Sequence, residues 1–180
     1  MASAMNARDA QAKIRWATDR FLSVLDRVSN AQWQYCPPLG QWSMSEVTEH
    51  VAVTNDGVLS LLSTRLTSPL AGPLALEDDE IPFLFYGGGE PPASQPLTGA
   101  WADRADAVDA LAASALRVIK WAGNTDLDLR ACGYVHPVFG LMDGVQWLLF
   151  LYAHTARHRG ELLDLERSSQ AAAATPYLPD

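Results

Sequence analysis

Two of the four histidines in this chain, His154 and His158, lie four residues apart in a largely apolar segment. Residues at positions i and i+4 share one face of a helix, so the two imidazoles would point the same way. The same face carries Trp147, Leu151 and Leu162, which indicates that it looks toward a core. We therefore expect two inward-facing imidazoles on one helix.

A third histidine, His50, lies in a second segment with helical periodicity, flanked by Val47 and Val51 and followed by Val58. Two adjacent helices could bring the three rings together, and three neutral imidazoles plus water form a common divalent-metal site. The alternative is that each histidine is a hydrogen-bonded packing residue. The coincidence of a pair, a shared inward direction and a third inward histidine favours the metal site.

The composition is that of an ordinary globular protein and argues against several functions. The chain has 180 residues, 48% hydrophobic and 19% charged, which suits one domain with a sizeable core. Its formal net charge of −8 and its scattered basic residues argue against a nucleic-acid partner. We find neither an apolar run of membrane-spanning length nor a leader peptide, so we expect a cytoplasmic protein without a membrane partner.

Helical periodicity recurs in four segments, at residues 7–28, 43–66, 100–122 and 143–167. The second segment begins with Ser43 and Glu46, a pair typical of a capping box. Helices of such similar length favour an all-α four-helix bundle. We predict a single domain over residues 1–167, followed by a flexible tail over residues 168–180.

The connections between these segments are long. Residues 67–99 contain six prolines and three consecutive glycines, a composition that excludes regular helix. A loop of this length either crosses the bundle or covers one of its ends, which favours crossover connections. Its apolar stretch at residues 81–86 should fold back on the bundle near the mouth of the histidine site, because large apolar side chains are costly to leave in water.

Several short motifs, in their order and spacing, resemble those of the DinB/YfiT-like metalloenzyme family. The motifs are Trp42-Ser43 ahead of His50, His136-Pro137-x-x-Gly140 ahead of Trp147, and His154-x-x-x-His158. The similarity covers the chain from about residue 10 to residue 166. It implies an up-up-down-down four-helix bundle, frequent homodimers, and a divalent ion, most often nickel or zinc, bound by His50, His154 and His158.

One departure from the family pattern concerns Glu161, because many relatives have glutamine at this position. A carboxylate one turn beyond His158 could orient an imidazole N–H, or it could accept a proton during catalysis. A solvated surface acid near the end of the helix is an equal alternative. For His136, which precedes a proline, we predict a packing role rather than metal ligation.

A three-histidine ion with open coordination positions can activate water or bind a thiol as thiolate. The family resemblance includes transferases and isomerases that use low-molecular-weight thiols, and members regarded as hydrolases. We therefore predict a metal-dependent enzyme that acts on a small molecule by thiol transfer or hydrolysis. The alternative is a non-catalytic helical module that binds a metal or small ligand in a stress response.

Overall fold

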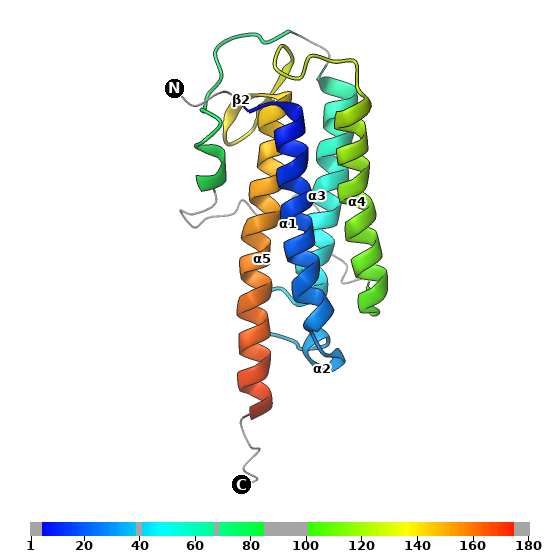
Figure 1. Ribbon diagram of the computed structural model, residues 1–180. Coiled ribbons are helices and arrows are strands. Elements are labelled where there is room, and N and C mark those ends of the chain that lie inside the picture. Colours follow the sequence, from blue (N-terminus) through cyan, green and yellow to red (C-terminus); the bar gives the residue numbers. More distant parts are fainter. Residues whose placement is uncertain (1–4, 39–40, 67–68, 85–100, 175–180) are drawn as a thin grey trace.

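Four long helices packed side by side dominate the computed structural model, which describes residues 5–38, 41–66, 69–84 and 101–174 (Figure 1). The elements are α1 (Ala7–Arg27), α2 (Asn30–Trp33), α3 (Met44–Arg65), the 3₁₀ helix η1 (Ile81–Phe83), α4 (Arg104–Asn124), β1 (Gly133–His136), β2 (Gly140–Asp143) and α5 (Gly144–Ala174). The predicted all-α bundle is thus confirmed, with one small hairpin added to it. None of the described helices combines the length and apolar character that crossing a membrane requires.

The helix boundaries follow local sequence signals. The predicted capping box is present at α3, where Ser43 Oγ accepts the backbone N–H of Glu46 at 3.3 Å and the Glu46 carboxylate accepts the Ser43 N–H at 2.8 Å. Helix α4 begins a little later than predicted, after Asp103, whose carboxylate accepts the backbone N–H of Ala105 at 2.8 Å. These side chains satisfy N–H groups that a helix leaves without internal partners.

The C-terminal helix corrects one sequence-based expectation. Helix α5 continues beyond the predicted end at Arg167 as far as Ala174, so the first half of the predicted flexible tail is helical. Ser169 is buried on this extension, and its hydroxyl donates to the Glu166 carbonyl at 2.8 Å. Residues 175–180 lie outside the described residues.

The direction of the helices differs from the predicted order. Helices α1 and α5 run one way, while α3 and α4 run the other way (Figure 1). Gln11 near the start of α1 donates to the Ile119 carbonyl near the end of α4 at 3.0 Å, whereas Arg27 at the end of α1 meets Glu166 near the end of α5. The connectivity is therefore up-down-down-up, and the up-up-down-down expectation is wrong. The long connection after α1 does not cross the bundle, because α2 folds within it and the chain returns at the same end.

The interior of the bundle contains two apolar clusters. One lies toward the hairpin and includes Leu62 and Leu148, and the other lies toward α2 and includes Phe21 and Leu111. Between them along the four long helices are buried polar residues: Thr18, Asn55, Ser114, His154, Thr155 and His158. A polar layer therefore divides the core, and the histidine pair of α5 belongs to it.

The loop before α4 contacts the bundle through part of its apolar stretch. Ile81 of η1 is fully buried in the apolar cluster toward the hairpin, in agreement with the expectation that this stretch folds back. Phe83 is 67% exposed, so the expectation does not hold for every residue. Phe85 and Tyr86 lie outside the described residues.

Candidate metal centre

His50 of α3 and the pair His154 and His158 of α5 converge inside the bundle. The Nε2 atom of His154 lies 3.0 Å from Nε2 of His50 and 3.2 Å from Nε2 of His158. One nitrogen from each ring falls within 4.8 Å of the other two. The prediction that two neighbouring helices bring the three rings to one point is therefore confirmed, and we call these residues the histidine triad.

Burial keeps the histidine triad away from bulk water. His154 and His158 are buried at 4% and 0% exposure, and His50 is half-buried. Desolvation lowers the pKa of His154 well below its ordinary value, and the neighbouring His158, His50 and Arg157 act in the same direction. A neutral imidazole is the form that binds a metal ion, so burial prepares His154 for this role.

Glu161 holds the ring of His158 in a defined orientation. Its Oε2 atom lies 2.8 Å from Nδ1 of His158, and its Oε1 atom accepts a hydrogen bond from Arg157 at 3.2 Å. A carboxylate can only accept, so the neutral ring of His158 carries its proton on Nδ1. The lone pair of His158 is then on Nε2, the atom that faces the other two rings. This contact matches the orienting role that was one of the predicted possibilities for Glu161.

The available protons limit how the three rings can bond to one another. Nε2 of His154 faces two neighbouring Nε2 atoms, and a neutral ring has only one N–H to place. With the lone pair of His158 also directed inward, the two contacts of His154 Nε2 cannot both be hydrogen bonds between neutral rings. A cation at the centre would satisfy all three lone pairs.

The spacing of the nitrogens also suits a metal ion. Ligand nitrogens at about 2.0–2.1 Å from a tetrahedral zinc ion lie roughly 3.3 Å from one another. The two closest Nε2 pairs of the histidine triad, at 3.0 and 3.2 Å, are near this value. The three histidines could therefore hold a divalent metal ion with little rearrangement.

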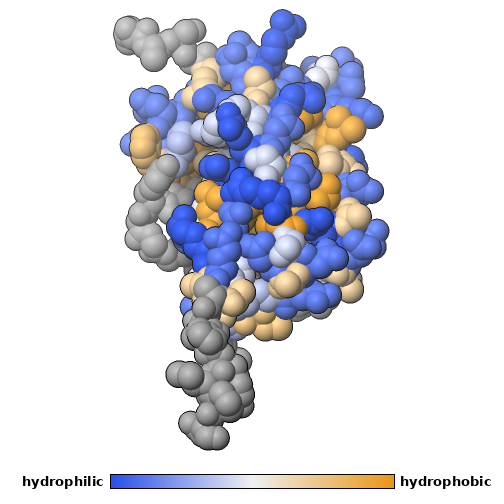
Figure 2. Space-filling view, turned by 60° about the horizontal axis from the view of Figure 1, so that its bottom comes forward, coloured by the Kyte–Doolittle hydropathy of each residue, from blue (hydrophilic) through white to orange (hydrophobic). Residues whose placement is uncertain are grey.

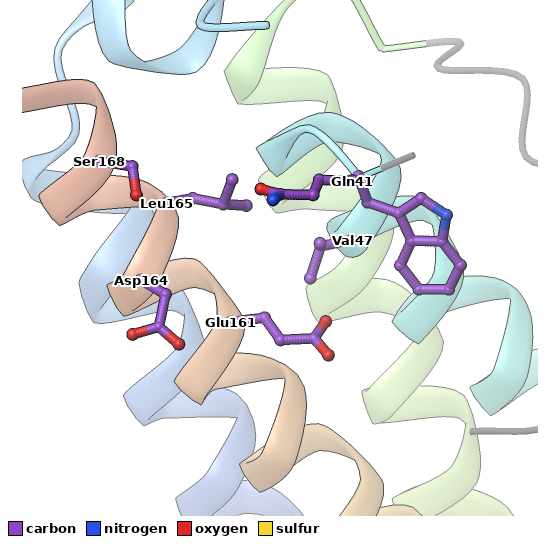
Figure 3. A pocket seen from close by; sticks show the side chains of 7 residues that line it. Gln41, Val47, Glu161, Asp164, Leu165 and Ser168 are labelled. Atoms are coloured by element: carbon purple, nitrogen blue, oxygen red, sulfur yellow. The ribbon is translucent and has the colours of Figure 1, made fainter. Parts of the chain in front are cut away.

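Trp42, immediately before α3, borders the histidine triad. Its ring centroid lies 4.8 Å from that of His50 and 6.1 Å from that of His158. The half-buried indole also lines a pocket of about 330 Å³ whose wall includes Glu161 (Figure 3). Trp42 therefore lies between the triad and this pocket.

His136 is not part of the triad. Its Nδ1 atom accepts the backbone N–H groups of Val138 at 3.1 Å and Phe139 at 3.2 Å, which closes the turn between β1 and β2. The ring stacks on Phe139 with centroids 4.5 Å apart, and burial lowers its pKa below the ordinary value. This arrangement agrees with the packing role that the sequence predicted.

Sequence reasoning missed the other residues of the pocket. Gln41, Asp164 and Ser168 line it, together with the buried side chains of Val47 and Leu165. The sequence signal that could have found it is the helical spacing of Glu161, Asp164 and Ser168, which places these polar residues on one face of α5.

The sequence model of the DinB superfamily matches residues 13–162 of this chain. The matched span includes all three triad histidines and Glu161. No curated protein and no solved structure gives a significant match.

Proposed function

The chain belongs to the DinB superfamily, and we propose that it is a metal-dependent enzyme that transfers a thiol group to a small molecule or hydrolyses one. In this proposal His50, His154 and His158 bind one divalent ion, nickel or zinc. The observation that carries the proposal is the convergence of three Nε2 atoms from two helices inside the bundle.

The ligand set determines which chemistry the site would support. When bound, a divalent ion held by three neutral ligands would favour hydroxide over water and thiolate over thiol. The residues of the chain prepare the site for this. Burial favours the neutral form of His154, Glu161 fixes the ring of His158, and Trp42 covers one side of the triad. Glu161 thus serves as a positioning residue, which a glutamine could replace in relatives.

Several features favour a small-molecule substrate. The pocket beside the triad has a volume of about 330 Å³, within the range of small-ligand sites. The net charge of −8 disfavours nucleic acids, whose phosphates attract clustered basic residues. A low-molecular-weight thiol as co-substrate follows from the family resemblance and from the affinity of such ions for thiolate.

Metal analysis followed by activity assays tests this proposal. We expect elemental analysis of the purified protein to find about one divalent ion per chain. After chelation, nickel, zinc or manganese is restored singly, and thiol conjugation to model electrophiles is measured beside ester hydrolysis. Activity that appears only with metal is the expected result.

Two other outcomes would contradict the enzymatic proposal. Equal activity with and without metal would exclude a metal-dependent mechanism. Tight stoichiometric metal binding without any turnover would favour the alternative of a non-catalytic metal-binding module.

A further inference from the structure

The pocket beside the histidine triad opens between the start of α3 and the last turns of α5 (Figure 3). Val47 and Leu165 supply an apolar floor, and Gln41 and Ser168 supply polar groups around it. Figure 2, which brings this end of the bundle forward, shows apolar surface enclosed by mainly hydrophilic surface. A molecule that fits here would combine an apolar body with polar groups.

The charges of the pocket favour a cation. Among the described residues that line it, the ionisable ones are two acids, Glu161 and Asp164. Their arginine partners, Arg157 and Arg167, do not belong to the lining. The side chains of Asp164 and Arg167 are 68% and 69% exposed, and such exposed ion pairs contribute little, so Asp164 can accept a new cationic partner at small cost.

Two of the lining residues also contact the histidine triad. Glu161 accepts the Nδ1 proton of His158, and Trp42 lies against the rings of His50 and His158. In Figure 3 the side chain of Glu161 extends from α5 toward α3, on the same side as Val47. A ligand in the pocket would therefore be separated from the triad by one layer of side chains.

We propose that this pocket binds the protonated-amine end of a small substrate with an apolar body, and so selects organic amines for reaction at the triad. An ammonium group has three N–H donors, and the acceptors among the lining residues include the carboxylate of Asp164 and the side-chain oxygen of Gln41. The indole of Trp42 adds an aromatic face, which attracts cations. The inference rests on the proposed function for its reaction, whereas binding of the amine requires no metal.

Calorimetric titration of the full chain with three matched probes tests the charge preference. The probes are 2-phenylethylamine, the neutral 2-phenylethanol and the anionic 3-phenylpropanoate, each added to metal-free and to metal-loaded protein. We expect the amine to bind about tenfold more tightly than the alcohol, the difference typical of a hydrogen bond to a charged group. The anion should show no saturable binding. Equal affinities for amine and alcohol would overturn the proposal.

A pair of charge-neutralising variants locates the binding. Asp164→Asn should weaken amine binding about fivefold, the upper range for an exposed ion pair, without changing the metal content. Asp126→Asn is the matched control, because Asp126 is an exposed acid at the opposite end of the bundle. It should leave amine affinity unchanged. Equal affinities in both variants would show that the amine binds elsewhere.

Failure of this inference and failure of the proposed function are distinguishable. If the protein binds metal but shows no preference for the amine, only the pocket assignment fails. If the amine binds and responds to Asp164→Asn while the protein retains no metal, the proposed function fails and the pocket assignment stands.

Discussion

Two clusters of polar side chains pack against α5, and they differ in the kinds of groups that they bring together. At the start of α5, Arg130 donates to Asp143 at 2.7 Å and to Asp78 at 2.9 Å, and it also bonds the Met5 carbonyl. The Met5 N–H in turn donates to Asp78 at 3.1 Å. In the middle of α5, the histidine triad directs three Nε2 atoms at one point. We call Arg130, Asp78, Asp143 and Met5 the Arg130 cluster; it combines a guanidinium donor with carboxylate and carbonyl acceptors, whereas the triad consists of three imidazoles.

The pKa shifts of the Arg130 cluster reflect this internal pairing. Burial alone would raise the pKa of Asp78, but hydrogen bonds and positive charge from Arg130 outweigh it and lower that pKa. Asp143 is buried more deeply, and burial raises its pKa despite the same arginine. The cluster connects Met5 and the loop before η1 to the hairpin. The comparison indicates that the Arg130 cluster maintains architecture, while the three histidines of the triad could bind a metal ion.

We expect the largest effect from a variant that removes one histidine of the triad. His154→Ala removes the histidine whose Nε2 lies closest to both partners, so metal retention should be lost. The protein should stay helical, because its stability comes mainly from the two apolar clusters. Elemental analysis and circular dichroism check both statements. His136→Ala is the control and should retain the metal.

A structural role for the ion would give a different result. If removal of the metal from the unaltered protein abolished the helical signal, metal binding would be coupled to folding. The contrast between the triad and the Arg130 cluster would then disappear, because both would maintain architecture.

We expect the second-largest effect from a variant that removes the cation of the Arg130 cluster. Arg130→Met leaves Asp143, whose side chain is 1% exposed, without its cation, so we expect a loss of about 3 kcal/mol in the free energy of unfolding. Metal affinity should not change. The control is Arg117→Met, because the ion pair of Arg117 with Asp56 is 50% and 48% exposed and should contribute below about 1 kcal/mol. Denaturant unfolding measures both variants, and similar losses would contradict the assigned difference.

The two clusters also differ in how far the sequence could predict them. The spacing of His154 and His158 and the periodicity around His50 located the triad, because both patterns act within single helices. The Arg130 cluster joins residues far apart in the chain, such as Asp78 and Arg130, and no local sequence pattern predicts such a contact. The up-up-down-down order was implied by the family resemblance, and it was wrong. The helix directions appear only in contacts between distant residues, such as Gln11 with Ile119. The pocket depends on how α3 and α5 meet, which is likewise a tertiary property.

A third variant weakens the triad without removing a ligand. Glu161→Gln keeps an oxygen that can accept the Nδ1 proton of His158, but it removes the negative charge that strengthens this bond. We expect metal affinity to fall about 10- to 100-fold, as for other residues that orient metal ligands. The rate at saturating metal should change little. Competition with a chelator measures the affinity.

The rate of this variant separates two roles for Glu161. Loss of most of the rate at saturating metal would identify Glu161 as a proton acceptor in the reaction. Asp164→Asn, on the same face of α5 but without a triad contact, should leave metal affinity unchanged and serves as the control.

The smallest effect concerns His136, a histidine whose lone pair is already satisfied. Its Nδ1 atom accepts two backbone N–H groups, those of Val138 and Phe139, and burial lowers its pKa. A lowered histidine pKa means that the folded state resists protonation. Its contribution to stability is complete above the unfolded pKa of about 6.5 and is lost as pH falls through the lower folded pKa.

Hydrogen exchange, corrected for its intrinsic pH dependence, measures this local effect. Protection of the Val138 and Phe139 amides should decrease as the pH is lowered below about 6.5, because a protonated Nδ1 can no longer accept their hydrogen bonds. The Leu148 amide within α5 should keep its protection over the same range. In His136→Phe the two hairpin amides should be weakly protected at every pH. If their protection in the unaltered chain were also independent of pH, Nδ1 of His136 would not be their acceptor. The contrast between His136 and the triad histidines would then be lost.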